Sequence, residues 1–427
     1  VQAQQADNVR LYNKELKPWK GASKVFTPAI LNATTIFKHY GASSTYKWLT
    51  FVEDVDICMP PTADTSDYRL YYSGQATPRK TNWTLASAGA GPYPNDYLEM
   101  GVPAPTAAPS VAATAGTSST ADTRAYVYTY VSTFGSIKEE SAPSPASALV
   151  TITTSQSVNV TGLPASAPPG KYNITHVRIY RTIAGDSTGS NYAFVTELAI
   201  GTTSYNDDLK AIQLGAALDT IGWLPPPSTL KGLVAMAGGV LAGFVGNTIY
   251  FSQPYFPHAW PLRYAMTVPY QIIGLGSMGT SLVVMTERFP YVISGNVPGS
   301  MSMEQVPVPQ PCVSKRSIVA AQTGVMYASP EGIMQIAPGS AGVISKPLFR
   351  RIEWQDYSPS TMVSAIFDSV YFSFFTSPTQ GNRAMVLSPD DTPALSFFLA
   401  QATHCHVDIK ESRFYFLNSQ DGCIYEA

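Results

Sequence analysis

The sequence is poor in charged residues and has no long apolar run. Asp, Glu, Lys and Arg make up 13% of the 427 residues, about half of the roughly 25% that is usual for globular domains. The formal net charge is −2, which disfavours a nucleic-acid reader with its basic stripe. The longest apolar run, 233–245, has 13 residues, short of the roughly 20 that span a bilayer. We therefore expect no membrane insertion by this chain.

Cysteine is also scarce. The four cysteines, Cys58, Cys312, Cys405 and Cys423, lie far apart and form no CxxC pair. This spacing disfavours a zinc site or a disulfide framework. A bond between Cys405 and Cys423 stays open, although free buried thiols fit the pattern better. The opening VQAQQ has neither a basic nor an apolar region, so the sequence predicts no signal peptide.

What the sequence does contain is a repeat in its second half. Each unit has an apolar strand-like run, a tight turn and another apolar run. These runs recur at intervals of 42 to 45 residues, beginning at Val240, Leu282, Val325, Val370 and Phe414. A β unit that recurs every 40 to 50 residues or so is typical of propeller blades. The fold class predicted is all-β, a β-propeller-like array; a β-sandwich with regular strands is the alternative.

Two breaks in composition divide the chain. Residues 103–122 are rich in Pro, Ala, Ser and Thr, which predicts a linker, and 223–227 (WLPPP) forms a stiffer boundary. Between them, short alternating runs predict an inserted Ig/fibronectin-III-like β-sandwich. The predicted domains are 1–102 (an N-terminal extended arm plus the first blade), 103–225 (the inserted sandwich with its linker) and 226–427 (the remaining blades).

The N-terminal hundred residues fit the repeat less well. Residues 47–51 and 68–72 have the pattern of strands of a further blade. From Trp48 to Val240, with the insert 103–225 left out, the chain is about one and a half units long. It therefore predicts one blade plus a strand that closes the ring on the last blade. The first 30 residues or so lack a strand pattern, and we expect them to wrap over the surface or over a neighbouring subunit.

The motifs in the sequence do not indicate catalysis. Gly274-x-Gly276-x-x-Gly279 passes the crude dinucleotide pattern, but a strand-like run follows where a helix is needed, so these glycines are interpreted as turn residues. Acidic residues in 53–56 and at 390–391 are interpreted as solvated turns; a glycosidase would need two of them facing each other. His404 and His406 share a strand face without a third metal ligand, which favours packing. No catalytic, cofactor-binding or metal-binding residue is assigned.

An aromatic stretch after a blade strand, PYFPHAWP (254–261), is the most distinctive candidate for contact with other chains. Large aromatic side chains anchor interfaces as readily as they fill cores. The interface candidates are Trp223, Tyr255, Phe256, His258 and Trp260.

Several stretches resemble podovirus tail nozzle (tail tubular, tail hub) proteins of tailed bacteriophages: DNVRLYNKELKPWKG, YRLYYSGQATPRKTNW, GGVLAGFVGNTIYFSQPYFPHAWP and YQIIGLGSMGTSLVVMTERFPYVISG. The resemblance implies a structural virion protein, assembled in the bacterial host cytoplasm, that forms a ring, usually a homohexamer, below the portal and adaptor. Such a ring encloses the DNA exit channel and contacts tail fibres or spikes, and genomic DNA passes without sequence-specific binding. The insert departs from a minimal nozzle and would be the platform where fibres dock.

A second class of function stays open, a β-propeller tail protein that binds or degrades glycans. A binding protein would expose aromatic side chains on the sandwich, such as Tyr126, Tyr128 and Tyr130. A degrading enzyme would present a facing pair of carboxylates from residues 53–56.

Overall fold

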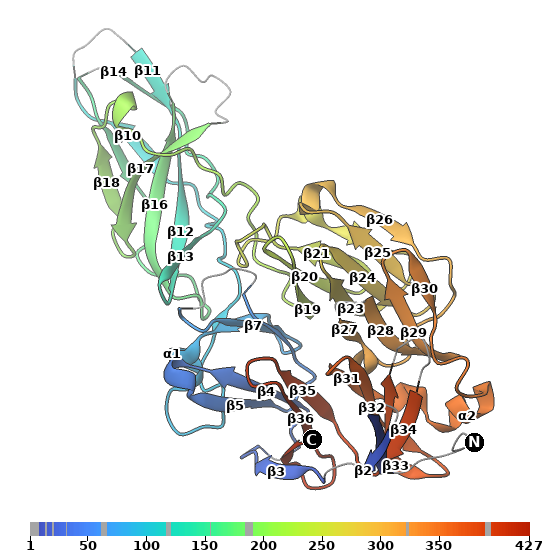
Figure 1. The fold of residues 1–427 in the computed structure, drawn as a ribbon. Helices are drawn as coiled ribbons and strands as arrows, with labels where there is room; N and C mark the ends of the chain where they lie inside the picture. Colours follow the sequence, from blue (N-terminus) through green and yellow to red (C-terminus); the bar gives the residue numbers. More distant parts are fainter. Residues whose placement is uncertain are drawn as a thin grey trace. The chain divides into compact units, whose positions relative to one another are not determined.

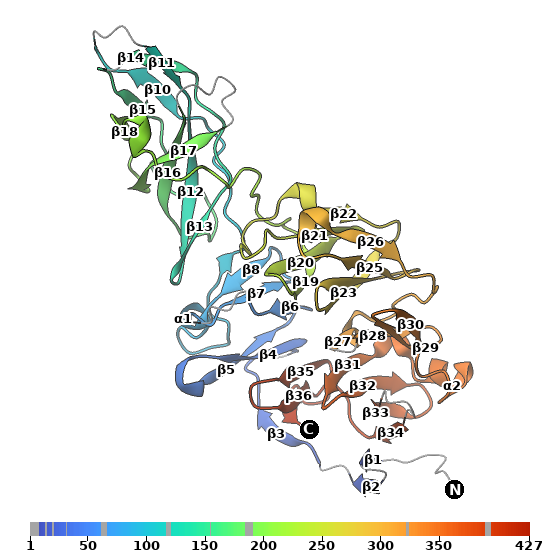
Figure 2. The ribbon, with the colours of Figure 1, turned by 45° about the horizontal axis from the view of Figure 1, so that its top comes forward.

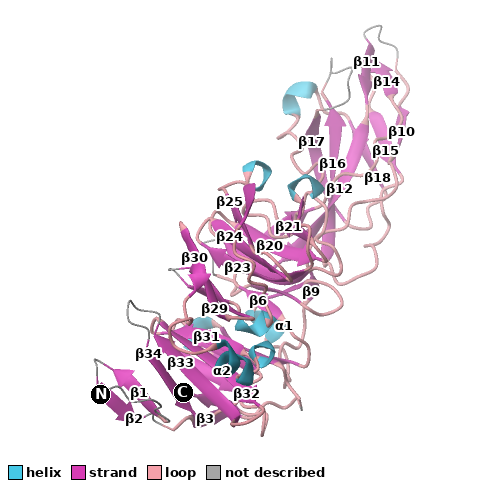
Figure 3. Ribbon diagram, turned by 90° about the vertical axis from the view of Figure 1, so that its right-hand side faces the viewer, coloured by secondary structure: helices cyan, strands magenta, loops and turns pink. Residues whose placement is uncertain are grey.

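The computed structural model describes residues 8–12, 15–18, 21–30, 32–60, 66–116, 121–153, 155–183, 191–321, 324–388 and 394–427. Short strands dominate, with only brief helical turns (Figure 3). None of the helices in the described part is long and apolar enough to cross a membrane. The chain folds into two compact units. One comprises Val1–Tyr97, Ser228–Tyr250 and Ala265–Ala427, and the other Leu98–Pro227 and Phe251–Tyr264.

The first unit is a β-propeller whose antiparallel sheets are arranged in a ring (Figure 1). The inner strands of these sheets line a central cavity. Among the described residues its blades are six four-stranded sheets, each given with its innermost strand first. They are β6 (Asp56–Cys58), β7 (Leu70–Ser73), β8 (Arg79–Thr81) and β9 (Leu98–Glu99); β19 (Lys231–Met236), β20 (Val240–Val245), β21 (Thr248–Phe251) and β22 (Met266–Thr267); β23 (Ile272–Met278), β24 (Ser281–Thr286), β25 (Tyr291–Ser294) and β26 (Ser302–Gln305); β27 (Val319–Ala321), β28 (Gly324–Ser329), β29 (Gly332–Ala337) and β30 (Ser340–Val343); β31 (Val363–Phe367), β32 (Val370–Ser377), β33 (Gly381–Ser388) and β34 (Ala394–Phe398); and β35 (His404–Asp408), β36 (Arg413–Leu417), β37 (Ile424–Glu426) and β3 (Ser23–Phe26). Strand β9 and the last residue of β21 fall within the bounds of the second unit.

The predicted repeat is confirmed, because the second strands of the five blades that follow residue 226 begin within one residue of the predicted positions. These strands are apolar on both faces since each blade is covered by the next one on either side. Val283 and Met285 of β24, for example, pack with Val325 and Tyr327 of β28 in one buried cluster. Full burial of such a side chain stabilises the fold by about 1.5–3 kcal/mol, so no blade is independent of its neighbours.

Helical segments are confined to loops. They are α1 (Trp83–Ala86), α2 (Arg351–Asp356) and the 3₁₀ turns η1 (Ala42–Ser44), η2 (Ala211–Gln213), η3 (Leu262–Tyr264), η4 (Pro298–Ser300), η5 (Lys315–Ser317) and η6 (Pro359–Thr361).

The N-terminal region closes the ring. Strand β3 pairs antiparallel with β37 and so completes the last blade, beside the C-terminus (Figure 2). The closing strand expected from the repeat length is therefore present. The expectation that the first 30 residues lack strands is wrong, because β1 (Val9–Tyr12) and β2 (Glu15–Pro18) form a hairpin before β3. These strands have only four residues each, too few to show an alternating pattern.

A two-stranded blade lies between the last and first full blades. It consists of β4 (Thr35–Tyr40) and β5 (Tyr46–Phe51). Strand β4 neighbours β35 on one side. On the other side the Thr35 hydroxyl donates to the Glu53 carbonyl at 2.8 Å and accepts from the Val55 N–H at 3.1 Å, next to β6. The N-terminal region thus supplies a closing strand, a half-size blade and a full blade, where the sequence predicted one blade and a strand.

A buried cation fixes the half-size blade to the last blade. Lys38 Nζ lies 3.0 Å from the Asp408 carboxylate and 2.6 Å from Glu411, and it donates to the Tyr415 hydroxyl at 3.1 Å. The side chains of Lys38 and Asp408 are only 2% and 3% exposed. Burial alone would lower the pKa of Lys38, but its hydrogen bonds, that to Glu411 foremost, outweigh burial and raise it. The ammonium therefore stays charged; we call these four residues the Lys38 cluster.

The second unit is a β-sandwich. A four-stranded sheet of order β13-β12-β16-β17 packs against strands of β10-β15-β18 and β11-β14. The fold class predicted from the sequence, a β-propeller with an inserted sandwich, is confirmed. The strands are β10 (Ser110–Ala113), β11 (Ala121–Arg124), β12 (Tyr126–Phe134), β13 (Ile137–Glu140), β14 (Val150–Thr153), β15 (Val158–Thr161), β16 (Ile174–Thr182), β17 (Tyr192–Ala199) and β18 (Ser204–Asp207).

Two expectations about this unit are corrected. Residues 103–122 are not simply a linker, because β10 lies within them and pairs with β15; its Ala and Val side chains give too weak an apolar signal to be recognised. The unit also extends beyond the predicted 103–225, since it takes in Phe251–Tyr264 from the loop between β21 and β22.

Candidate functional site

The five predicted interface residues all lie in the second unit, where four of them come together. The ring of Phe256 lies 4.7 Å from that of Trp223 and 5.9 Å from that of His258, centroid to centroid. The Trp260 N–H donates to the Leu224 carbonyl at 2.7 Å, next to Trp223. Loop 251–264 is thereby attached to the end of the insert, which the sequence alone could not indicate.

Three of these residues are core residues. Trp223, His258 and Trp260 are buried, and the Trp260 indole N–H donates to the Pro257 carbonyl at 2.9 Å. His258 Nδ1 lies 4.0 Å from the buried Glu139 carboxylate. Within this chain they therefore form the base of the aromatic group, and they do not present a surface to another chain.

Tyr255 and Phe256 project from this base. Tyr255 is 62% exposed and Phe256 41%, which is unusual for adjacent aromatic residues. We call the tight turn that carries them, 253–259, the aromatic turn. It is fixed by backbone hydrogen bonds from Gln253 to Ala259 at 2.8 Å and from Phe256 to Gln253 at 3.0 Å. Two exposed rings on such a braced turn have the character of an interface anchor.

The backbone of Tyr255 is strained. Its φ is +65°, in the left-handed region where a non-glycine residue costs of order 1–3 kcal/mol. The surrounding turn imposes this conformation. Strain of this kind is often retained at binding sites, where it holds a side chain in a required direction.

The central cavity of the propeller is the second candidate site. It has a volume of about 710 Å³ and is lined by the inner strands of all the blades just described, the half-size blade included. Gly274 and Gly276 lie in the cavity wall on β23, and a Cβ on either would come within 2.6 Å of Ile318 or Val325. Their interpretation as turn residues is therefore wrong; only Gly279, with φ +61°, lies in a turn.

Ion pairs cross one part of this cavity. Lys315 Nζ lies 3.1 Å from Asp54 and 2.8 Å from Asp56, and Arg316 pairs with Asp54 as well. Arg316 also donates to the Thr35 hydroxyl at 3.0 Å. Lys315 and Arg316 precede β27, whereas Asp56 is the first residue of β6 and Asp54 lies just before that strand. The strands β19 and β23 stand between them in the ring, so these pairs bridge the cavity.

This geometry removes the basis for a glycosidase centre at residues 53–56. Asp54 and Asp56 share one ammonium, and Asp56 accepts a further hydrogen bond from the Gly232 N–H at 2.9 Å. Asp56 is not a solvated turn residue, because it begins β6 and its side chain is only 17% exposed. Asp54 precedes the strand and is 49% exposed, as the sequence interpretation expected. Burial lowers the pKa of Arg316 to about 10, well above neutrality, so its guanidinium is charged at pH 7. Residues 390–391 lie outside the described part of the chain.

The histidines and cysteines form no metal centre in the described part of the chain, where no group of three or more potential ligands gathers. All four cysteines are free thiols. His404 and His406 line the cavity, and each accepts a backbone hydrogen bond from β4.

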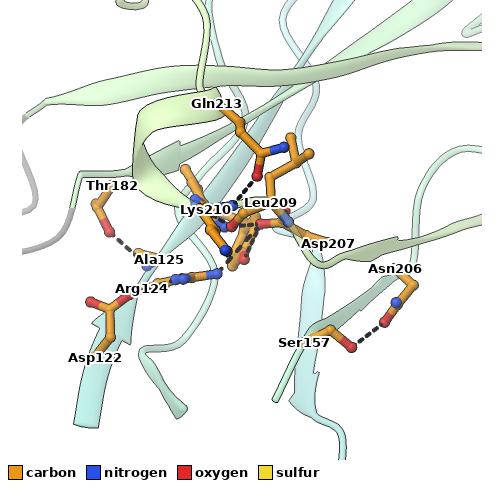
Figure 4. Close-up of polar contacts among 12 residues, drawn as sticks. Asp122, Arg124, Ala125, Ser157, Thr182, Asn206, Asp207, Leu209, Lys210 and Gln213 are labelled. Atoms are coloured by element: carbon orange, nitrogen blue, oxygen red, sulfur yellow. Dashed lines mark hydrogen bonds and ion pairs between the residues drawn. The ribbon is translucent and has the colours of Figure 1, made fainter. Parts of the chain in front are cut away.

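A buried ion cluster holds the sandwich together (Figure 4). The fully buried Asp207 pairs with Arg181, lies 3.8 Å from Arg124 and accepts from the Tyr126 hydroxyl at 2.7 Å. Arg181 donates in addition to the Leu209 carbonyl at 2.8 Å. The cluster connects the end of β18 to β12 and β16, so its role is structural.

The tyrosine stripe of β12 is also structural. Tyr126, Tyr128 and Tyr130 are buried in the core between the sheets. They therefore do not form the exposed aromatic surface that glycan binding by the sandwich would require.

Comparison with known proteins adds little. No family model matches the chain, and no curated protein matches it. Among solved structures, apo AztD from Citrobacter koseri is 11% identical, with 70% of this chain and 77% of that chain covered and a TM-score of 0.32. BBS1N in complex with ARL6DN is 10% identical, with 94% and 96% covered and a TM-score of 0.34. PorZ of Porphyromonas gingivalis is 10% identical, with 63% and 40% covered and a TM-score of 0.28. We draw no functional argument from these similarities.

Proposed function

We propose that this protein is a structural subunit of a bacteriophage tail, which forms a ring around the DNA exit channel and carries tail fibres or spikes on its sandwich unit. The observation that carries the proposal is the aromatic turn. Tyr255 and Phe256 are exposed on a braced, strained backbone, which suits a permanent protein contact better than a small-molecule site. The low charge content fits large interfaces from which charged residues are depleted.

In this proposal DNA passes between copies of the chain and not through any one propeller. Lys315 and Arg316 bridge the propeller cavity to Asp54, so the path along it is obstructed. A lumen between copies needs no basic lining, since Lys and Arg contacts to phosphates would hold the DNA in place. The net charge of −2 is consistent with such a lumen.

The aromatic turn belongs to the unit proposed as the fibre platform, so we assign it to fibre docking. Virions in which Tyr255→Ser and Phe256→Ser are combined should contain this chain in normal amount and lose the fibre or spike protein. Quantitative mass spectrometry of purified virions measures both. Absence of the wild-type chain from virions would overturn the whole proposal, whereas normal fibre content in the variant would overturn only the assignment of the turn.

No feature described above favours the glycan-directed alternative. Its two expected signatures were exposed tyrosines on the sandwich and facing carboxylates at 53–56. The tyrosines are buried and the aspartates are bound to Lys315. Binding of the purified chain to host polysaccharide would nevertheless count against a purely structural role.

A further inference from the structure

Neighbouring strands β4 and β35 meet along a seam that is joined by side chains. They belong to different sheets, and side chains of β35 contact β4 where backbone hydrogen bonds would otherwise be needed. Residues two apart on a strand face the same way, so the side chains of His404, His406 and Asp408 on β35 form one row. The three contacts are His404 Nδ1 accepting from the Ile36 N–H at 3.4 Å, His406 Nε2 accepting from the Lys38 N–H at 3.4 Å, and the Asp408 carboxylate accepting from the Tyr40 hydroxyl.

The two histidine contacts require neutral rings. A backbone N–H can only donate, so the imidazole nitrogen that faces it must carry no proton. Protonation would place two N–H groups against each other and add a positive charge. The third contact behaves differently, because a carboxylate accepts until it is itself protonated. The seam thus has two contacts that fail on acidification and one that persists to lower pH.

The charges around the two rings reinforce this difference. His404 faces Arg316 and Lys315 from η5 and has His406 on its own strand; burial first, then these charges, lowers its pKa well below the ordinary value. Burial likewise lowers the pKa of His406 to about 4, although Asp408 opposes the shift and Lys38 adds to it. Both rings are therefore neutral at pH 7.

Apolar groups complete the surroundings of His406. The ring of Phe37 lies 4.9 Å away, and that of Trp48 6.0 Å. A further histidine, His39, lies on β4 itself; its Nε2 is 2.8 Å from the Tyr68 carbonyl, and burial lowers its pKa to about 4. It faces away from β35, so a test must separate its titration from that of the seam.

We propose that the seam between β4 and β35 is an acid-operated latch on the central cavity. Protonation of His404 and His406 opens it from the end at Ile36, while the Lys38 cluster keeps the other end closed and acts as the hinge. This inference rests on the fold alone and goes beyond the proposed function.

The direction of the effect follows from linkage. Because the pKa of each ring is lower in the closed seam than in the open one, the open state takes up protons more readily. The closed seam is fully stable above about pH 6.5, the ordinary histidine value. It loses stability as the pH falls from there towards about 4. For His406 alone, opening at pH 5 should increase by about tenfold or more over pH 7.5.

Hydrogen–deuterium exchange of the full chain measures this opening directly. Exchange of the peptide covering 35–40, corrected for intrinsic rates, is compared at pH 7.5 and pH 5.0. The matched variant combines His404→Asn with His406→Gln. An amide oxygen then replaces each accepting nitrogen, the variant cannot titrate, and His39 is retained. Strand β32 (Val370–Ser377) serves as the internal reference.

The latch predicts that wild-type protection of 35–40 falls by more than tenfold at pH 5.0, because both histidines contribute, while the variant and β32 keep theirs. Equal protection of wild type at both pH values would overturn it. An equal loss in the variant would do the same, because the loss would then come from His39 or from another group. Should the double variant be unfolded at pH 7.5, His406→Gln alone provides the same test with a smaller difference.

Discussion

Replacing Lys38 by methionine should be among the most destabilising single changes in the propeller. Met fills much of the same volume but removes the cation from the Asp408 carboxylate, which is 3% exposed and 3.0 Å from Nζ. Breaking a buried pair from one side costs about 3–5 kcal/mol, because it leaves an uncompensated charge. Glu411, 40% exposed, can turn to solvent and adds little. The cost therefore arises mainly at Asp408.

Urea unfolding monitored by tryptophan fluorescence can measure this loss. At an m-value of about 2–3 kcal/mol/M, the midpoint should fall by about 1–2 M. The matched control is Arg413→Ala, which removes the pair with Glu426 on the neighbouring strands. Arg413 is 51% exposed, so this change should cost less than about 1 kcal/mol. If Lys38→Met costs no more than Arg413→Ala, the Lys38 cluster does not fix the half-size blade.

Three further predictions concern the same architecture. Removing residues 1–27, which include β3, should lower the melting temperature of the propeller clearly more than removing residues 1–20, because only the longer truncation exposes the edge of β37. An equal fall in melting temperature for the two truncations would refute ring closure by β3. Excising 103–225 alone should cause aggregation, because it removes Trp223 and the other residues that cover Phe256 and Trp260. If 251–264 is also replaced by a short turn, the protein should be monodisperse in size-exclusion chromatography. A monodisperse protein after the simple excision would contradict this. Arg181→Met should destabilise the sandwich by about 3–5 kcal/mol, because it removes a buried cation from Asp207. Lys138→Met, at an exposed pair, should cost less than about 1 kcal/mol. Similar unfolding midpoints for the two variants would show that the ion cluster does not stabilise the sandwich.

The repeat was visible in the sequence because it arises from local chemistry. Each second strand, such as Val240–Val245, is covered on both faces and so appears as a continuous apolar run at a constant interval. The longest sandwich strand was equally clear, since in β12 tyrosines alternate with residues of the other face, whereas the short β10 was missed. Patterns of this kind depend on the burial of each strand, so they can be recognised without knowing how the strands and units are arranged in space.

Long-range pairing could not be predicted in the same way. Strand β3 pairs with β37 almost 400 residues later, and nothing in SKVF marks it as a closing strand. The half-size blade was missed for a related reason, because its first strand joins its neighbours through Lys38, His404 and His406 and not through a sheet. From the sequence, the two histidines were assigned to packing, because nothing in it indicates the backbone N–H groups from which they accept hydrogen bonds.

The aromatic stretch shows the same limit at the candidate site. Its composition indicated an anchor or a core, and the structure contains both: Trp260 is buried, whereas Tyr255 is exposed. Which ring points outwards depends on the positive φ of Tyr255 and on attachment to the insert beside Trp223. Neither is encoded in spacing or composition.

The proposed function requires that copies of this chain form a ring around a channel. Negative-stain electron microscopy of the purified chain, with the mass of the particles measured on the same sample, tests this requirement most directly. We predict closed rings of one stoichiometry with a central opening bounded by several copies. A monomer that cleaves host polysaccharide would contradict the claim and favour the glycan-directed alternative.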